Sequence, residues 1–293
     1  RFTEEHHMLA ENGGFSTQDI EYLHHGGRAM KMRLFKPDGQ GPFPGVVDLH
    51  GGAWNKGDLT DCNDRDEFFS KAGIAVAAVD FRHAGDGYLA SMADINFAIR
   101  WLKAHAADHQ ISPDRIGICG QSSGGHLAML TAMRPNDERY SGISLDTGLP
   151  PVDASVCCVG MAWPVINPLS RYRNALRGRA SASPPGWIGD IPESHDRFWV
   201  TEANMSEGNP LLALERGETV ETPPALWVQG TPDDVHDYHD PESGREINEP
   251  ERFVENYQSS GGIIELIHID NAERSTKASF DPLASFFCKQ FHI

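Results

Sequence analysis

The sequence predicts an α/β protein with a mostly parallel central sheet covered by helices. Short apolar runs recur along the chain, and longer amphipathic segments separate them. Such runs are typical of strands buried on both faces, and the amphipathic segments are typical of helices packed on a sheet. With 293 residues, 39% of them hydrophobic, the chain is long enough to bury a large core. We expect residues 1–293 to form a single domain.

The first predicted elements form an antiparallel hairpin over residues 19–23 and 30–35, divided by Gly26-Gly27. Short apolar runs predict six further strands, over residues 45–49, 74–79, 115–119, 154–159, 225–228 and 263–267. Helices are expected between them, at about 62–72, 88–107, 123–133, 250–260 and 280–290. In the second helix, apolar residues recur at three- and four-residue steps and should face the sheet as one stripe: Leu89, Met92, Ile95, Ile99 and Leu102.

Residues 161–210 interrupt this alternation with several prolines, glycines and aromatic residues. We interpret the segment as a lid or cap insertion, because it precedes the late strands, where site loops gather. The alternative is a surface excursion that packs its own aromatics. Separately, Trp54, Trp163 and Trp199 either wall an acyl or aryl pocket or pack in the core. Four arginines inside the segment either attract an anionic substrate or form a solvated helix face: Arg171, Arg173, Arg177 and Arg179.

Composition excludes several classes of protein. The 42 acidic residues outnumber 25 lysines and arginines, and the resulting formal charge of −17 argues against binding to nucleic acid or to anionic membranes. No window reaches the roughly 18 apolar residues of a membrane span. Five cysteines, odd in number and irregularly spaced, indicate neither a disulfide framework nor a zinc ribbon. We therefore expect a cytoplasmic protein, with the adjacent Cys157 and Cys158 buried.

The motif Gly120-Gln121-Ser122-Ser123-Gly124 lies between a predicted strand and a predicted helix. A G-x-S-x-G turn in this context holds its serine on a strained corner at the carboxyl edge of a sheet. Small flanking residues are needed there because larger side chains would clash. Ser122 is therefore the predicted nucleophile.

A second glycine motif, His50-Gly51-Gly52, follows the strand predicted at 45–49. Backbone N–H groups of glycines approach an oxyanion closely because no Cβ intervenes. Together with the N–H of Ser123, those of Gly51 and Gly52 would form a three-donor oxyanion hole.

These motifs resemble the α/β-hydrolase superfamily, and within it the hormone-sensitive-lipase-like esterases. The resemblance runs from about residue 30 to the C-terminus, and four segments carry it in family order: His50-Gly51-Gly52-Ala53-Trp54, Asp80-Phe81-Arg82, Ile99-Arg100-Trp101-Leu102, and residues 120–128. Ala53 and Ser123 depart mildly from the usual Gly and Ala. The resemblance implies the α/β-hydrolase fold and hydrolysis of a small carboxylic ester or related acyl compound through an acyl-enzyme, with no metal and no organic cofactor.

The order of the triad in this family is serine, acid, histidine. The acid should follow the strand at 225–228, where Asp233 occupies the matching place and its neighbour Asp234 could displace it. A buried carboxylate there would orient an imidazole and stabilise its protonated form. The alternative is a solvated acidic loop, since more acidic residues follow closely.

The histidine is where the sequence departs from the family. Residues 261–275 match the family segment without a gap, and Arg274 stands in the histidine position. A guanidinium stays protonated, so it cannot accept the serine proton. His236 and His239, just past Asp233, are the candidate substitute bases; otherwise they are a solvated pair, or with Asp240 a metal-ligand set. His268 should point into the packing of the sheet.

Two functions therefore compete at this stage. The intact elbow and oxyanion loop favour a serine hydrolase that acts on a carboxylic ester or small amide. The arginine at position 274 favours a non-catalytic protein that binds a small molecule on the same fold.

Overall fold

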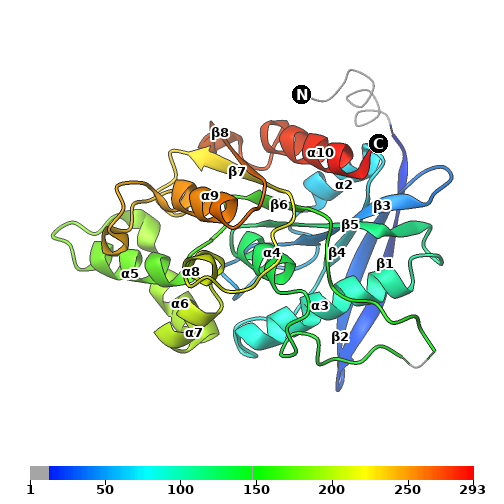
Figure 1. The fold of residues 1–293 in the computed structure, drawn as a ribbon, viewed down its shortest axis with the longest axis horizontal. Helices are drawn as coiled ribbons and strands as arrows, with labels where there is room; N and C mark the ends of the chain where they lie inside the picture. Colours follow the sequence, from blue (N-terminus) through cyan, green and yellow to red (C-terminus); the bar gives the residue numbers. More distant parts are fainter. Residues whose placement is uncertain (1–12, 147) are drawn as a thin grey trace.

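The structure, a computed structural model, describes residues 13–146 and 148–293. Its strands form one sheet in the order β1-β2-β4-β3-β5-β6-β7-β8 (Figure 1). The hairpin of β1 (Phe15–His25) and β2 (Arg28–Pro37) is antiparallel, as is the pairing of β2 with β4 (Ala75–Val79). The remaining pairings are parallel and involve β3 (Phe43–Leu49), β5 (Ile111–Gln121), β6 (Val159–Ala162), β7 (Ala225–Thr231) and β8 (Ile264–Asp270). The predicted fold class and opening hairpin are confirmed.

Helices cover both faces of the sheet and enclose two hydrophobic cores. The larger core includes apolar residues of α3 (Tyr88–Ala104), α4 (Ser123–Met133) and α9 (Glu249–Ser259). The other lies under α2 (Asn63–Lys71) and α10 (Lys277–Phe291). All five helices lie within a few residues of their predicted positions. Helix α3 buries an apolar stripe against the sheet, whereas every residue of α4 is buried. No helix of the described residues is long and apolar enough to cross a membrane.

The segment over 161–210 contains helices that the sequence analysis did not assign. They are α5 (Pro168–Arg179), a 3₁₀ turn η1 (Gly186–Ile188), α6 (Ile191–Trp199), α7 (Glu202–Glu207) and α8 (Pro210–Glu215). Three of the prolines that interrupt the alternation of apolar runs stand in the first turns of α5, α6 and α8. A proline there breaks no hydrogen bond of the helix, because N–H groups of the first turn have no partner within it. Figure 1 shows these helices grouped at the end of the sheet away from β1 and β2.

Three local predictions are wrong. The strand predicted at 154–159 begins only at Val159, and Cys157 before it is exposed, because an apolar run alone does not distinguish a strand from an extended loop against a sheet. In α3, Leu89 is 43% exposed, and Tyr88 instead packs its ring on Trp199 with centroids 5.0 Å apart. The other four residues of the predicted stripe are buried.

A buried ion pair links α2 to the carboxyl ends of two central strands. Arg65 donates from Nη2 to both carboxylate oxygens of Asp48, at 2.7 and 2.8 Å, and from Nη1 to Oε1 of Gln121 at 3.1 Å. The Arg65 and Asp48 side chains are at most 2% exposed. Since the oxyanion loop follows β3 and the serine elbow follows β5, this contact holds the starting points of both segments in register.

We expect Arg65→Met to lower the free energy of unfolding by roughly 3–5 kcal/mol, because it leaves Asp48 as an uncompensated buried charge. Adding Asp48→Asn should recover much of the loss. Arg33→Met, which breaks the partly exposed pair with Asp19, should cost less than about 1 kcal/mol. Urea unfolding measures all three variants, and equal losses for Arg65→Met and Arg33→Met would contradict the argument.

Candidate active site

Ser122 occupies the tight corner between β5 and α4. Its φ of 51° and ψ of −119° are strained for a residue with a Cβ. Its N–H donates to the carbonyl of Ala162 at 2.9 Å. A Cβ on Gly120 would lie 2.2 Å from the carbonyl oxygen of Gly124, and one on Gly124 would lie 2.4 Å from that of Leu49. Only glycine fits at either position. Ser122 itself is partly exposed at the carboxyl edge of the sheet, as predicted.

The glycine loop after β3 lies directly against this corner. A Cβ on Gly51 would be 3.3 Å from the Cβ of Ser122, and Gly52 has a φ of 103°, which favours glycine. Within the described chain, the N–H groups of Gly51 and Gly52 donate to no other residue. Ser123 is the first residue of α4, where the N–H has no partner in its own helix. These three N–H groups are therefore the candidate donors of an oxyanion hole.

Aromatic residues from the 161–210 segment fasten this glycine loop. Trp54 stacks on Phe198 with ring centroids 5.4 Å apart and meets Trp199 edge-on at 5.5 Å. Its Nε1 donates to Nδ1 of His126 at 3.1 Å. Trp54 and Trp199 are 1% and 0% exposed and belong to the core. Their role as pocket walls is therefore not supported, whereas core packing is.

The turn after β7 brings an acid and a histidine together within four residues. The Oδ1 of Asp233 accepts hydrogen bonds from the backbone N–H groups of Val235, at 3.0 Å, and His236, at 3.3 Å. Its Oδ2 lies 2.7 Å from Nδ1 of His236 and accepts from Nε2 of Gln229 at 3.2 Å. The N–H of Asp237 closes the turn on the carbonyl of Asp233 at 2.9 Å. The turn thus holds the imidazole ring on the carboxylate.

The other ring nitrogen of His236 lies on the serine. Nε2 of His236 is 2.9 Å from Oγ of Ser122, although 114 residues separate them in the sequence. A neutral imidazole has one donor and one acceptor, so an Nδ1–H that donates to Asp233 leaves Nε2 to accept the serine proton. The three side chains have the connectivity of a nucleophile, a base and an orienting acid.

Burial and charge act in opposite directions on the two titrating groups. Burial lowers the pKa of His236, and the hydrogen bond with Asp233 opposes this, while the cations Arg171 and Arg274 lower it further. The net pKa of His236 lies below the ordinary value. Burial alone would raise the pKa of Asp233, but the hydrogen bond and charge of His236, the N–H of Val235 and the charge of Arg274 together lower it, so the carboxylate remains ionised. At neutral pH, His236 is therefore a neutral imidazole beside an ionised acid.

Arg274 approaches the same carboxylate oxygen as His236. Its Nη1 is 3.7 Å from Oδ2 of Asp233, and its guanidinium lies over the ring of Trp163, 5.3 Å from the centroid. A Cβ on Gly230 would come within 3.2 Å of Cδ of Arg274, so the glycine leaves room for this side chain. The residue in the usual histidine position thus contacts the acid and not the serine.

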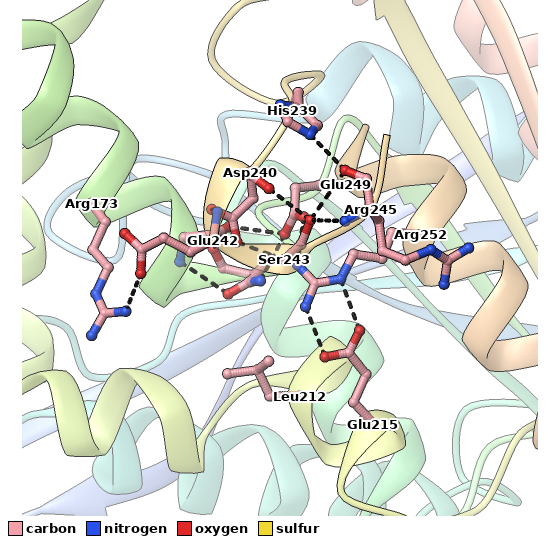
Figure 2. Close-up of polar contacts among 12 residues, drawn as sticks. Arg173, Leu212, Glu215, His239, Asp240, Glu242, Ser243, Arg245, Glu249 and Arg252 are labelled. Atoms are coloured by element: carbon pink, nitrogen blue, oxygen red, sulfur yellow. Dashed lines mark hydrogen bonds and ion pairs between the residues drawn. The ribbon is translucent and has the colours of Figure 1, made fainter. Parts of the chain in front are cut away.

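A network of ion pairs fastens the loop that carries His236 (Figure 2). Arg252 of α9 donates to Glu215 of α8 at 2.8 and 2.7 Å, and lies 3.4 Å from Asp240 in the loop. From the other side, Arg173 of α5 donates to Glu242 at 2.6 Å. The loop that carries His236 is therefore held by ion pairs to α9 on one side and to α5 of the 161–210 segment on the other.

The remaining predicted site residues lie elsewhere. His239 is exposed, and its Nε2 lies 2.6 Å from the carbonyl of Arg245, away from the serine. Asp234 is exposed and does not displace Asp233. The side chain of His268 is 41% exposed and lies 3.8 Å from Asp237, so its predicted burial in the sheet is wrong. Side chains on a sheet's last strand meet solvent on a face that the final helix leaves uncovered.

The metal-ligand set of His236, His239 and Asp240 does not converge. His236 bonds Ser122 and Asp233, whereas Asp240 faces Arg252. Within residues 13–146 and 148–293, no three His, Cys, Asp or Glu side chains are arranged to hold a metal ion.

Sequence reasoning missed two polar residues of this site. Gln229, which donates to Asp233, is a fully buried polar residue at the end of the apolar run of β7, and that contrast is the signal that could have identified it. Arg171 is buried beside the triad instead of forming part of a solvated helix face. Nothing in the spacing of the four arginines distinguishes it from its neighbours.

Comparisons with known proteins agree with the fold. The BD-FAE family model matches residues 32–159, which include the oxyanion loop and elbow but end before Asp233. The probable carboxylic ester hydrolase LipM of Mycobacterium tuberculosis is 32% identical over 127 residues, or 42% of this chain and 29% of that protein. The carboxylesterase NlhH of the same species is 35% identical over 98 residues, or 32% of this chain and 30% of that protein. The matched regions thus span about three tenths of each relative.

Solved structures match nearly the whole chain. The carboxylesterase EstE1 from a metagenomic library superposes with a TM-score of 0.71 at 20% identity, covering 98% of this chain and 94% of that one. Thermogutta terrifontis esterase 2, phosphonylated by sarin, gives a TM-score of 0.69 at 20% identity, covering 93% and 94%. The fold is that of the α/β-hydrolases.

The strain at Ser122 has a measurable consequence. We expect Ser122→Gly to be about 1 kcal/mol more stable than Ser122→Ala, because glycine relieves the positive φ at a modest entropic cost. At Ser285, an ordinary position inside α10, the same comparison should favour alanine by roughly 0.5–1 kcal/mol. Urea unfolding of the four variants tests this, and a preference for alanine at both positions would show that the corner is unstrained.

Proposed function

We propose that this chain, an α/β-hydrolase that resembles the hormone-sensitive-lipase-like esterases, hydrolyses a small carboxylic ester or amide through an acyl-enzyme, with His236 as its base. The observation that carries the proposal is the hydrogen-bonded series from Ser122 through His236 to Asp233, at 2.9 and 2.7 Å. It supplies the base that position 274 lacks.

The proposed mechanism follows from these contacts. Oγ of Ser122 attacks the acyl carbon while Nε2 of His236 accepts its proton. The N–H groups of Gly51, Gly52 and Ser123 stabilise the negative charge on the acyl oxygen. The imidazolium then protonates the leaving alcohol or amine, and a water molecule, deprotonated by the same imidazole, releases the acid and restores Ser122. None of these steps needs a metal or an organic cofactor.

Arg274 has a positioning role in this proposal. Its guanidinium is fixed over Trp163 and lies 3.7 Å from Asp233, so it favours the ionised form of the carboxylate that orients His236. The same positive charge opposes formation of the imidazolium. Arg274 thus holds the acid in place while it keeps the resting base neutral.

The 161–210 segment is proposed to cap the site. Its helix α6 meets the glycine loop directly, since Nδ2 of Asn55 donates to the carbonyl of Ser194 at 2.9 Å. Its helix α5 meets the loop carrying His236 through the hydroxyls of Ser170 and Tyr238, 2.8 Å apart. Both halves of the site therefore contact the same segment.

A non-catalytic binding protein is the weaker candidate. Its main support was the absence of a histidine at position 274. An imidazole within hydrogen-bond distance of the strained serine favours hydrolysis instead, because a binding protein gains nothing from that geometry.

The first test removes the nucleophile and the base separately. We expect Ser122→Ala and His236→Ala each to lower kcat for p-nitrophenyl acetate by roughly 10⁴- to 10⁶-fold, the scale for loss of a triad member. His239→Ala, a matched histidine on the same loop, should stay within a few fold of wild type. A fluorophosphonate probe should label Ser122 in the wild type. Turnover that survives His236→Ala, or an unlabelled Ser122, would refute the proposed mechanism.

The second test follows the pH dependence. Because only neutral His236 accepts a proton, kcat/KM should rise with pH and reach half its maximum below the ordinary histidine value of about 6.5. Arg274→Gln removes a nearby cation and should move this midpoint to higher pH. The measurement is a pH profile of kcat/KM for a neutral ester.

Arg274→His serves as the companion variant. If His236 is the base, a histidine at position 274 should bring no gain in rate at pH 7.5. A large gain in rate, or a midpoint that Arg274→Gln leaves unchanged, would show that the wild-type base lies elsewhere.

A further inference from the structure

Arg171 is a buried cation that the proposed mechanism does not use. It stands on α5, and only 5% of the residue is exposed. Its Nε and Nη1 are buried and have no hydrogen-bond partner in the described part of the chain. Its Nη2 also makes no hydrogen bond or ion pair within residues 13–146 and 148–293. Burial lowers the pKa of Arg171 to about 10, so it is still charged at neutral pH.

The other arginines of α5 show how unusual this is. Arg173 donates to Glu202 and Glu242, Arg177 donates to Glu242, and Arg179 donates to Glu193. These three side chains are at least 36% exposed and still have carboxylate partners. A buried charge needs a partner far more than an exposed one does, because it has lost its hydration. The helix therefore leaves unpaired the one arginine for which pairing matters most.

The acidic groups near Arg171 are already engaged. They are Asp233, Asp190 and Tyr238. Burial raises the pKa of Tyr238 well above its ordinary value, so this hydroxyl is neutral at neutral pH, and it pairs with Ser170. Asp233 accepts from His236 and Gln229, and Asp190 has a side chain that is 71% exposed and lies 3.7 Å from Arg197. None of the three forms a hydrogen bond with the guanidinium in residues 13–146 and 148–293. The electrostatic field of Arg171 is thus left for a group that residues 13–146 and 148–293 do not supply.

Arg171 directly follows a residue of α5 that contacts the loop carrying His236, since the hydroxyls of Ser170 and Tyr238 are 2.8 Å apart, and this places that group at the active site. Its charge acts directly on His236, whose Nε2 bonds Ser122, and on His195 of α6. A ligand carboxylate beside Arg171 would accept charge-assisted hydrogen bonds from the guanidinium. It would also cancel one of the two positive charges that oppose the imidazolium of His236.

We propose that Arg171 is a substrate-binding residue and that the preferred substrate is an ester or amide that carries a free carboxylate close to the scissile bond. The proposal rests on the proposed function and names the substrate class for the same site. The formal charge of −17 disfavours the approach of anions to the protein as a whole. A preference for an anionic substrate must therefore arise from a local site.

The experiment compares charged and neutral members of matched ester pairs. 4-Acetoxybenzoate against its methyl ester places the carboxylate in the leaving group, and monomethyl adipate against dimethyl adipate, counted per ester bond, places it in the acyl group. We expect the wild type to show a higher kcat/KM for the charged member of at least one pair. Arg171→Met should lower kcat/KM for that charged member by roughly 10- to 100-fold, as loss of a charge-assisted hydrogen bond implies. It should leave the neutral member within a few fold.

The control is Arg179→Met, which removes the same charge from the same helix at an exposed, paired position. It should leave both rates and their ratio unchanged. Thermal unfolding provides a second readout: Arg171→Met should unfold at a higher temperature than the wild type, because it removes an unpaired buried charge. Adipate and 4-hydroxybenzoate should stabilise the wild type against heat but not Arg171→Met.

The outcomes separate this inference from the proposed function. If neutral esters are hydrolysed but neither charged member is preferred and neither anion stabilises the wild type, the carboxylate site is wrong while the hydrolase stands. If Arg171→Met lowers the unfolding temperature and slows both members equally, Arg171 is structural and the inference is overturned. If no ester is turned over but the anions stabilise the wild type through Arg171, the carboxylate site stands and the hydrolase does not.

Discussion

The carboxylate of Asp233 is the point on which the candidate site depends. It accepts hydrogen bonds from two backbone N–H groups of its own turn, from Gln229 and from the ring of His236. The backbone bonds curl the chain so that the residue three positions later returns to the acid, and the ring bond aligns its imidazole. The other parts of the site are arranged around this turn. The hydroxyl of Ser122 contacts Nε2 of His236, and the ion pairs of Figure 2 hold the loop that follows the turn.

Because Asp233 and His236 lie on one turn, long-range packing does not have to position the carboxylate and the imidazole separately. An acid and a histidine on separate loops must each be positioned by long-range packing, whereas here a local backbone turn supplies their relative geometry. In the proposed mechanism, the segment after β8 therefore does not supply the base. Arg274 occupies it with a cation that packs on Trp163 and lies beside Asp233. Because the charge of Arg171 also acts on His236, the site combines one ionised acid with two cations and a neutral imidazole. Such a site favours negative charge in whatever it binds.

The fold prediction was accurate where a local sequence pattern determines the structure and failed where it does not. Alternation of apolar runs and amphipathic stripes reports burial directly, so seven of the eight predicted strands and all five predicted helices lie where local pattern places them. The run at 154–159 misled because burial does not require a strand ladder. The helices of 161–210 were missed because their prolines stand in first turns, where they start helices, and pattern alone does not say on which side of a helix end a proline lies.

The sequence by itself determined the local chemistry of this protein: a serine flanked by glycines between a strand and a helix, a second glycine motif after a strand, and an arginine that cannot act as a base. These properties depend on neighbouring residues and on side-chain chemistry, both of which are readable along the chain. Which of fourteen histidines meets Ser122, and which of four arginines is buried without a partner, was decided only by the tertiary structure. The reason is that a 2.9 Å contact across 114 residues is set by how strands, helices and loops pack, and single-residue propensities carry no information about that distance.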